Sequence, residues 1–145
     1  MLNKIMSASF VKDYKIYAQF SNGITKVYSM QKMFDEIESF NELKNNDLFY
    51  YGSVDIGGYG ISWNDKIDLS SDEIWENGKE IKTKFDNIMS IGEATRIWGL
   101  DDSTLRKAIA RGKFINGVDT QKFGKQWVIA KEAMEREYGH TKNLL

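Results

Sequence analysis

Five carboxylates stand close together in the sequence and are the first residues that could do chemistry: Asp55, Asp65, Asp68, Asp72 and Glu73. Paired carboxylates perform acid–base catalysis when burial raises the pKa of one of them. Here Asp68 and Asp72 flank an expected helix start, where negative charge is stabilised by the positive end of the helix dipole. We therefore predict structural roles for these side chains and no catalytic residues, so the protein is not expected to be an enzyme.

Other catalytic and metal-binding patterns are missing from the sequence. It contains no cysteine, which excludes disulfides, thiolate zinc sites and cysteine nucleophiles. The single histidine, His140, lies in the segment 140–145, beyond the last periodic apolar residues, and we predict this segment to be a tail. Residues 64–68 lack the glycine and the final glutamate of a calcium loop, and residues 57–60 do not continue into a phosphate-binding loop. We expect no metal and no cofactor.

A second group of chemically capable residues is basic and lies between residues 102 and 131. Seven basic residues accompany two acidic ones there, a local balance of +5 in a chain whose net charge is −1. Lysine and arginine contact phosphates and bases, and small hydroxyl side chains let a helix approach the duplex closely. The candidate DNA-binding residues are Ser103, Thr104, Arg106, Lys107, Arg111, Lys113, Lys122 and Lys125.

Two predicted helices position most of these side chains. Ser90 begins the first helix in a capping box with Glu93, and Gly99 ends it. Asp101 is placed to cap a second helix over 102–111. Two helices joined by about three residues that include a glycine are typical of a helix-turn-helix.

The spacing of apolar residues sets the orientation of the second helix. Leu105, Ala108 and Ile109 share one face, which predicts that this face packs against the first helix. Arg106 and Lys107 then point outward, where a DNA groove could receive them.

A β-hairpin and a last helix are expected after the second helix. Residues 120–129 are predicted to form two short strands around Phe123–Gly124, with Lys122 and Lys125 beside the turn. A basic hairpin of this kind suits the phosphate backbone or the minor groove. The last helix is expected to bury Ala133, Met134 and Tyr138.

Residues 89–139 resemble the MerR/excisionase-like winged helix-turn-helix domains of bacteria, phages and plasmids. The resemblance rests on Ser90-Ile91, Glu93-Ala94, Trp98-Gly99-Leu100, Ser103-Thr104-Leu105-Arg106, Ala108-Ile109, Gly112-Lys113-Phe114, Gly117, Gly124, Trp127-Val128-Ile129 and Ala133-Met134. It implies that 102–111 is the recognition helix and that Lys122–Lys125 form the tip of the wing.

The first part of the chain has the pattern of a small α+β domain. Residues 14–20 alternate apolar and polar positions as a half-buried strand does, and Asn22-Gly23 predicts a hairpin into the strand 24–29. Further strands are expected at 5–12, 48–56 and 59–65. One main helix is expected over about 30–40, with Ser29 as its cap. A short helix is expected from the capping box of Ser70 and Glu73 to a left-handed stop at Gly78.

Residues 5–78 resemble a bacterial family catalogued as domain of unknown function 2442. The matching residues are Phe20-Ser21-Asn22-Gly23, Trp63, Ile67-Asp68-Leu69-Ser70, Asp72, Ile74-Trp75 and Gly78. Members of the family often occur beside toxin–antitoxin-like partners, and some carry a C-terminal helix-turn-helix. The resemblance implies a module for binding a partner protein or for oligomerisation.

We thus expect an α+β protein in which a small mixed or antiparallel sheet with one main helix precedes a mainly α winged helix-turn-helix. The expected parts are 1–78 as the partner-binding or dimerisation domain, 79–88 as a linker, and 89–139 as the DNA-binding domain. Because MLNKIMSASF lacks the apolar run of a signal peptide, we expect the cytoplasm as the location.

Three functions agree with these patterns. The first is a sequence-specific transcriptional regulator of double-stranded DNA, such as an antitoxin-like autorepressor. It would act as a homodimer, because a single module buries only about 600–1,000 Å² on DNA, which is too little for tight specific binding at physiological salt. The second is an excisionase-like architectural DNA protein. The third is a mobile-element protein that inhibits a protein partner such as a toxin.

Overall fold

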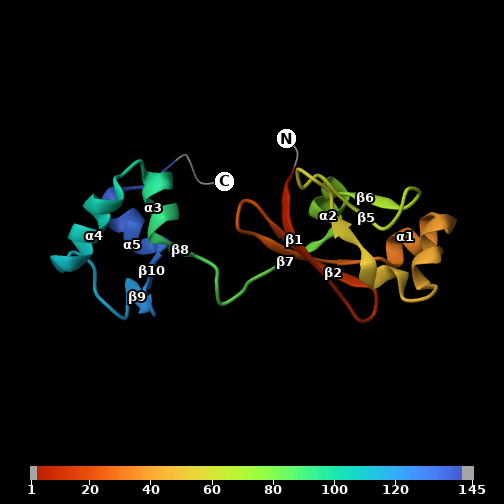
Figure 1. The fold of residues 1–145 in the computed structure, drawn as a ribbon, viewed down its shortest axis with the longest axis horizontal. Helices are drawn as coiled ribbons and strands as arrows, with labels where there is room; N and C mark the ends of the chain where they lie inside the picture. The colour runs from red at the N-terminus through yellow and green to blue at the C-terminus, as the bar shows by residue number, and fades with distance from the viewer. Residues whose placement is uncertain (1–2, 142–145) are drawn as a thin grey trace. The chain divides into compact units, whose positions relative to one another are not determined.

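The computed structural model describes residues 3–141, which form two compact units that divide between Thr83 and Lys84. Both units combine helices with antiparallel sheets (Figure 1), which confirms the predicted α+β class. Within residues 3–141 there is no helix with the length and apolar character needed to cross a membrane.

The first unit is built on a four-stranded antiparallel sheet. Its strands are β1 (Ile5–Val11), β2 (Lys15–Phe20), β3 (Thr25–Ser29) and β7 (Lys79–Ile81), in the order β1-β2-β3-β7. As the alternation predicts, Ile16, Ala18 and Phe20 are buried on one face of β2. Gly23 takes a φ of 89° in the turn between β2 and β3, so the hairpin predicted at Asn22-Gly23 is confirmed.

A smaller antiparallel sheet and a helix complete this unit. The sheet has the order β4-β5-β6 and comprises β4 (Ser53–Val54), β5 (Gly60–Ser62) and β6 (Asp68–Ser70). The helix α2 (Ser71–Asn77) begins at Ser70, whose hydroxyl accepts a hydrogen bond from the Glu73 N–H at 3.1 Å. The predicted cap is therefore present, and Ile74 on α2 is fully buried.

The main helix of the first unit is shorter than the sequence predicts. The helix α1 spans Gln31–Glu36, and Ile37 leaves the helix with an extended backbone. A 3-10 helix, η1 (Glu38–Lys44), follows. Side chains three residues apart align in a 3-10 helix, and this alignment buries both Phe40 and Leu43. Ser29 is not the cap residue, although its hydroxyl accepts a hydrogen bond from the Gln31 N–H.

The strand predicted over 48–56 was wrong for its first half. Residues Leu48–Tyr51 form a 3-10 helix, η2, and only Ser53–Val54 are extended and paired, as β4. Aromatic residues favour strands, but here Phe49 is fully buried and its carbonyl accepts a hydrogen bond from Trp63 Nε1 at 2.8 Å. Tertiary packing of Phe49 thus overrides the local preference.

Gly78 does not adopt the predicted left-handed conformation, since its φ is −78° and its ψ is 157°. A Cβ atom at this position would lie 2.5 Å from the Ile74 carbonyl oxygen. Glycine is therefore required for a close approach rather than for a positive φ. The residues that follow, Lys79–Ile81, pair with β3 as strand β7, although they were expected to belong to the linker.

The second unit contains three helices and a three-stranded antiparallel sheet. The helices are α3 (Ile91–Trp98), α4 (Asp102–Ala110) and α5 (Lys131–Tyr138). The strands are β8 (Ile88–Ser90), β9 (Thr120–Phe123) and β10 (Gln126–Ala130), in the order β8-β10-β9. Its core consists of Met89, Ile91, Ala94, Ile97, Leu105, Ile109, Phe114, Ile129, Ala133 and Met134.

Candidate nucleic-acid interface

A capped helix and a glycine turn fix the position of α4. The Ser90 hydroxyl accepts a hydrogen bond from the Glu93 N–H at 3.1 Å, and Gly99 ends α3 with a φ of 67°. Both features were predicted. Asp101 occupies the N-cap position of α4, but its side chain makes no capping hydrogen bond, so that part of the prediction was wrong.

One face of α4 holds the unit together and the rest is open to solvent. Leu105 is fully buried, Ile109 is buried, and α4 packs against α3. The predicted phase of the helix is therefore observed. Five of the eight candidate residues belong to α4 or directly follow it, and all five are exposed: Ser103, Thr104, Arg106, Lys107 and Arg111.

Arg106 has a partner that we did not predict. Its Nε donates a hydrogen bond to Asp102 Oδ2 at 2.6 Å, one helical turn earlier. Both side chains stay about half exposed, at 53% for Arg106 and 54% for Asp102. The four-residue spacing of Asp102 and Arg106 was the available sequence signal, because acidic and basic residues at this spacing meet on a helix surface.

The hairpin β9–β10 presents two further candidate residues. Phe123 pairs with Gln126, so the turn consists of Gly124 and Lys125, and Gly124 takes a φ of 61°. Lys122 and Lys125 are both exposed. Lys122 Nζ lies 5.8 Å from the ring centroid of Trp127, which pairs with it across the hairpin.

Lys113 is the eighth candidate and has a competing contact. It is exposed, but its Nζ lies 4.5 Å from the ring centroid of Tyr138 on α5. A cation over an aromatic face is attracted to the ring. Lys113 is therefore drawn toward α5, and its ring contact is shorter than the 5.8 Å contact of Lys122 with Trp127.

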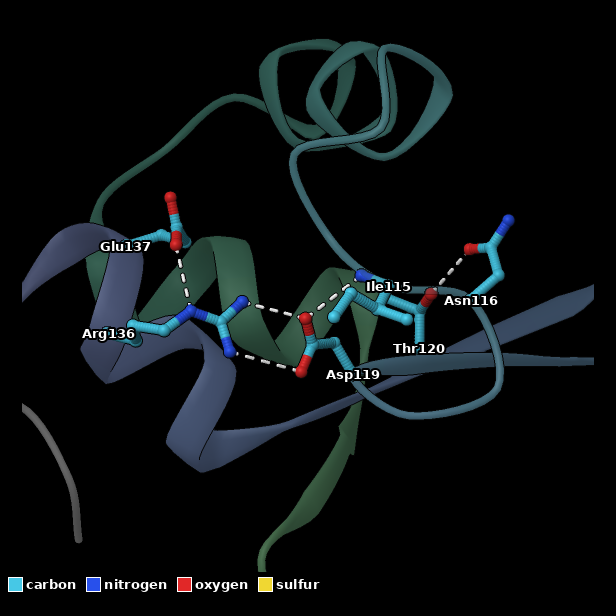
Figure 2. A network of polar contacts seen from close by, with 6 residues as sticks. All are labelled: Ile115, Asn116, Asp119, Thr120, Arg136 and Glu137. Carbon is cyan, nitrogen blue, oxygen red and sulfur yellow. Dashed lines mark hydrogen bonds and ion pairs between the residues drawn. The ribbon is translucent and has the colours of Figure 1, made fainter.

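A carboxylate and an arginine tie the loop before the hairpin to α5 (Figure 2). Asp119 accepts two hydrogen bonds from the Arg136 guanidinium, at 3.1 Å from Nη1 and 2.7 Å from Nη2. It also accepts a hydrogen bond from the Ile115 backbone N–H at 2.9 Å. These donors hold the pKa of Asp119 below its ordinary value, with the Arg136 hydrogen bonds as the largest cause. The same contact raises the pKa of Arg136.

This clamp lies directly before the first strand of the hairpin. The Asp119 side chain is only 7% exposed, and the next residue, Thr120, is the first residue of β9. The Thr120 hydroxyl donates to Asn116 Oδ1 at 2.7 Å within the same loop (Figure 2). No local sequence pattern predicts this role, because Asp119 and Arg136 are 17 residues apart and lie on different elements.

A hollow separates α4 from the hairpin. It has a volume of about 140 Å³ and is lined by Arg106, Ile109, Ala110 and Trp127. Trp127 is half-buried, so its ring contributes both to the core and to this surface. The second unit therefore has an exposed basic helix and a basic hairpin turn, with a mostly apolar hollow between α4 and β10.

Of the five clustered carboxylates of the first unit, Glu73 and Asp72 have separate structural contacts. Glu73 accepts hydrogen bonds from Tyr28 Oη and Lys32 Nζ, both at 2.8 Å. Burial, with a further contribution from Glu73, raises the pKa of Tyr28. Asp72 accepts from the Asn3 backbone N–H at 3.3 Å, and Asp65 and Asp68 are exposed. In the part of the chain that the structure describes, no three acidic, histidine or cysteine residues lie together as a metal site requires.

Comparison with known proteins finds a family match for each of two parts of the chain. Residues 80–143 match a helix-turn-helix domain model, which confirms the helix-turn-helix. No curated protein matches the chain. The crystal structure of a "putative DNA binding protein" from Nitrosomonas europaea ATCC 19718 is similar over 79% of this chain and 80% of that chain, with 14% identity and a TM-score of 0.48. Residues 5–80 match the family described as protein of unknown function (DUF2442), and since this match spans more than half of the 145 residues, the chain belongs to that family.

Proposed function

We propose that the protein binds double-stranded DNA in a sequence-specific manner and regulates transcription. The observation that carries the proposal is the exposed surface of α4, which lies in the matched helix-turn-helix domain. It presents Arg106 and Lys107 beside two hydroxyl residues, and exposed Arg111 directly follows it. The sequence from 103 to 118 contains no acidic residue that would repel phosphate. In this proposal α4 is the recognition helix in the major groove.

The hairpin β9–β10 serves as a wing in the proposed complex. Lys122 and Lys125 stand at its exposed turn, where they can contact phosphates beside the groove that α4 occupies. The order of helix-turn-helix, hairpin and final helix supports an assignment to the MerR/excisionase-like group. Lys113 makes a smaller contribution, because it is held near Tyr138.

The first unit supplies dimerisation or a protein partner in this proposal. Residues 1–89 carry ten basic and fourteen acidic residues, so this part adds no attraction for DNA. A dimer would place two recognition helices about one DNA turn, roughly 34 Å, apart. An antitoxin-like autorepressor with a toxin as partner is the form of regulator that we propose, acting in the cytoplasm.

A binding titration tests the proposal. The full-length protein should select duplexes from a random pool, and it should bind them about 10³-fold or more tightly than unselected duplexes. The double variant Lys122→Ala/Lys125→Ala should weaken binding to both kinds of duplex and reduce the salt slope by about 2 per protomer.

Lys12→Ala/Lys15→Ala is the matched control, since it removes two exposed lysines from the first unit. It should leave binding unchanged. Equal losses in the two double variants would mean that general charge, and not the hairpin, attracts DNA. Failure to select any duplex would refute sequence-specific binding.

One observation favours a second candidate function, that of an architectural DNA protein. Phe123 is 62% exposed at the hairpin turn, beside Lys122. Apolar side chains that insert between base steps kink the duplex by about 20–90°. If the protein bends DNA, Phe123→Ser should abolish the bend, measured by energy transfer between dyes at the duplex ends, while binding is largely retained. A straight duplex in the wild-type complex would leave the regulator as the function.

A further inference from the structure

We infer that Asp102 and Arg106 together form a site that recognises a guanine base in the major groove. The inference rests on the proposed function and specifies which base the recognition helix contacts. It also assigns a role to an acidic residue that would otherwise repel a phosphate-rich ligand.

The hydrogen bond between the two side chains leaves the correct donors free. Arg106 donates from Nε to Asp102 Oδ2 at 2.6 Å. No described residue accepts a hydrogen bond from its two terminal amino groups, Nη1 and Nη2. Guanine presents two acceptors, O6 and N7, on its major-groove edge, and an arginine fork bonds both at once. The free end of Arg106 matches this pair of acceptors.

The position of Arg106 limits the directions in which the free end can point. Asp102 holds the guanidinium from the N-terminal end of α4, and Arg106 is one of the residues that line the hollow, together with Ile109, Ala110 and Trp127. A free arginine loses much rotamer entropy when it is fixed by a ligand. Because Arg106 is already restrained, less of that entropy remains to be lost when it meets the base.

The charge of Asp102 adds discrimination. A carboxylate beside the guanidinium disfavours a phosphate contact by Arg106, since both the phosphate and Asp102 are anionic. Exposed ion pairs of this kind contribute little to the stability of the fold. Substitution of Asp102 should therefore leave the protein folded and change only how Arg106 selects its ligand.

Asp101 provides a matched control for this proposal. It precedes Asp102, carries the same charge, is exposed, and makes no capping hydrogen bond. Asp101→Ala and Asp102→Ala thus remove equal charge from the start of α4, but only Asp102→Ala removes the partner of Arg106.

The experiment measures base preference at each position of a duplex selected by the wild-type full-length protein. Each base pair is replaced in turn by the other three, and affinity is determined for wild type, Asp101→Ala, Asp102→Ala and Arg106→Lys. In the wild type, one guanine should be preferred by about 10-fold or more over other bases. Arg106→Lys should weaken that preference, because lysine lacks the rigid planar fork that holds both acceptors in one geometry.

Asp102→Ala should reduce the same preference several-fold while affinity for unselected DNA rises, because a negative charge is lost. Asp101→Ala should raise affinity for unselected DNA to a similar extent and keep the preference. Combining Asp102→Ala with Arg106→Lys should add no further loss at that position. Retention of the full guanine preference in Asp102→Ala overturns the inference while the proposed function stands. A wild-type protein that selects no duplex overturns both.

Discussion

At the residue scale, Arg106 and Arg136 both form ion pairs in the second unit but serve different purposes. Arg136 is bound on both amino groups and on Nε by Asp119 and Glu137, so it has little capacity for another ligand. Arg106 uses only Nε. Arg136 therefore stabilises the fold, whereas Arg106 keeps donor groups that can bind a ligand.

The first prediction concerns Asp119, which is the buried partner in the Asp119–Arg136 ion pair. Asp119→Asn should lower the free energy of unfolding by about 2 kcal/mol, since charged hydrogen bonds to a nearly buried group are weakened. Urea denaturation followed by tryptophan fluorescence measures the change. Glu137→Gln is the control, because Glu137 bonds only the Nε of a half-exposed arginine, and its effect should stay within about 0.5 kcal/mol. Equal effects would show that burial of Asp119 does not matter.

The pH dependence of stability gives the second prediction. The pKa of Asp119 is lower in the folded protein than in the unfolded chain, where it is about 4. The unfolded state thus binds more protons between the two pKa values, and the stabilisation is complete above about pH 4 and decreases as the pH falls through the folded pKa. The difference in unfolding free energy between wild type and Asp119→Asn should persist from pH 5 to 8 and shrink toward pH 3. A constant difference would contradict this linkage.

At the scale of elements, the starts of α3 and α4 look alike in sequence but differ in structure. Ser90 makes a capping hydrogen bond and Asp101 does not. The third prediction follows: Ser90→Ala should cost about 1 kcal/mol of unfolding free energy, whereas Asp101→Ala should cost a few tenths. Thermal denaturation of both variants measures the difference. A larger loss for Asp101→Ala would imply a capping contact in solution that the structure lacks.

The fourth prediction concerns Gly52, which directly precedes β4 and lies close to Phe10 on the main sheet. A Cβ atom on Gly52 would lie 2.6 Å from Trp63 Nε1 and 2.7 Å from Phe10 Cζ. Trp63 cannot move freely, because its Nε1 donates to the Phe49 carbonyl in the core. Gly52→Ala should therefore destabilise the first unit by about 1–3 kcal/mol, measured by denaturation. Gly92→Ala on α3 is the control, since no atom lies within 4 Å of the added Cβ.

At the scale of the whole molecule, each unit has its own hydrophobic core. The buried clusters of the two units share no residue. The boundary between the units lies between Thr83 and Lys84. The fifth prediction tests whether the first unit dimerises the protein. The full chain should bind an inverted repeat with a salt slope near about −7, and residues 84–145 alone should bind with a slope near about −4. Sedimentation of the two proteins without DNA gives an independent measure, and equal slopes would argue against the dimer.

Local sequence patterns predicted those features that depend on neighbours along the chain. These features arise from residues within about one or two turns of one another. They are the hairpin at Asn22-Gly23, the caps at Ser70 and Ser90, the stop at Gly99 and the outward phase of α4. The charge pattern from 103 to 118 was equally visible, so most of the candidate interface could be described in advance.

Tertiary structure decided the features that depend on residues far apart in the chain. The 3-10 helix at Leu48–Tyr51 exists because Phe49 and Trp63 share a core, and the pairing of Lys79–Ile81 with β3 brings the end of the first unit back to its sheet. The clamp of Asp119 by Arg136 likewise joins a loop to a distant helix. Sequence periodicity specifies which face of an element is buried, but the partner buried against it is set by the packing of the whole unit.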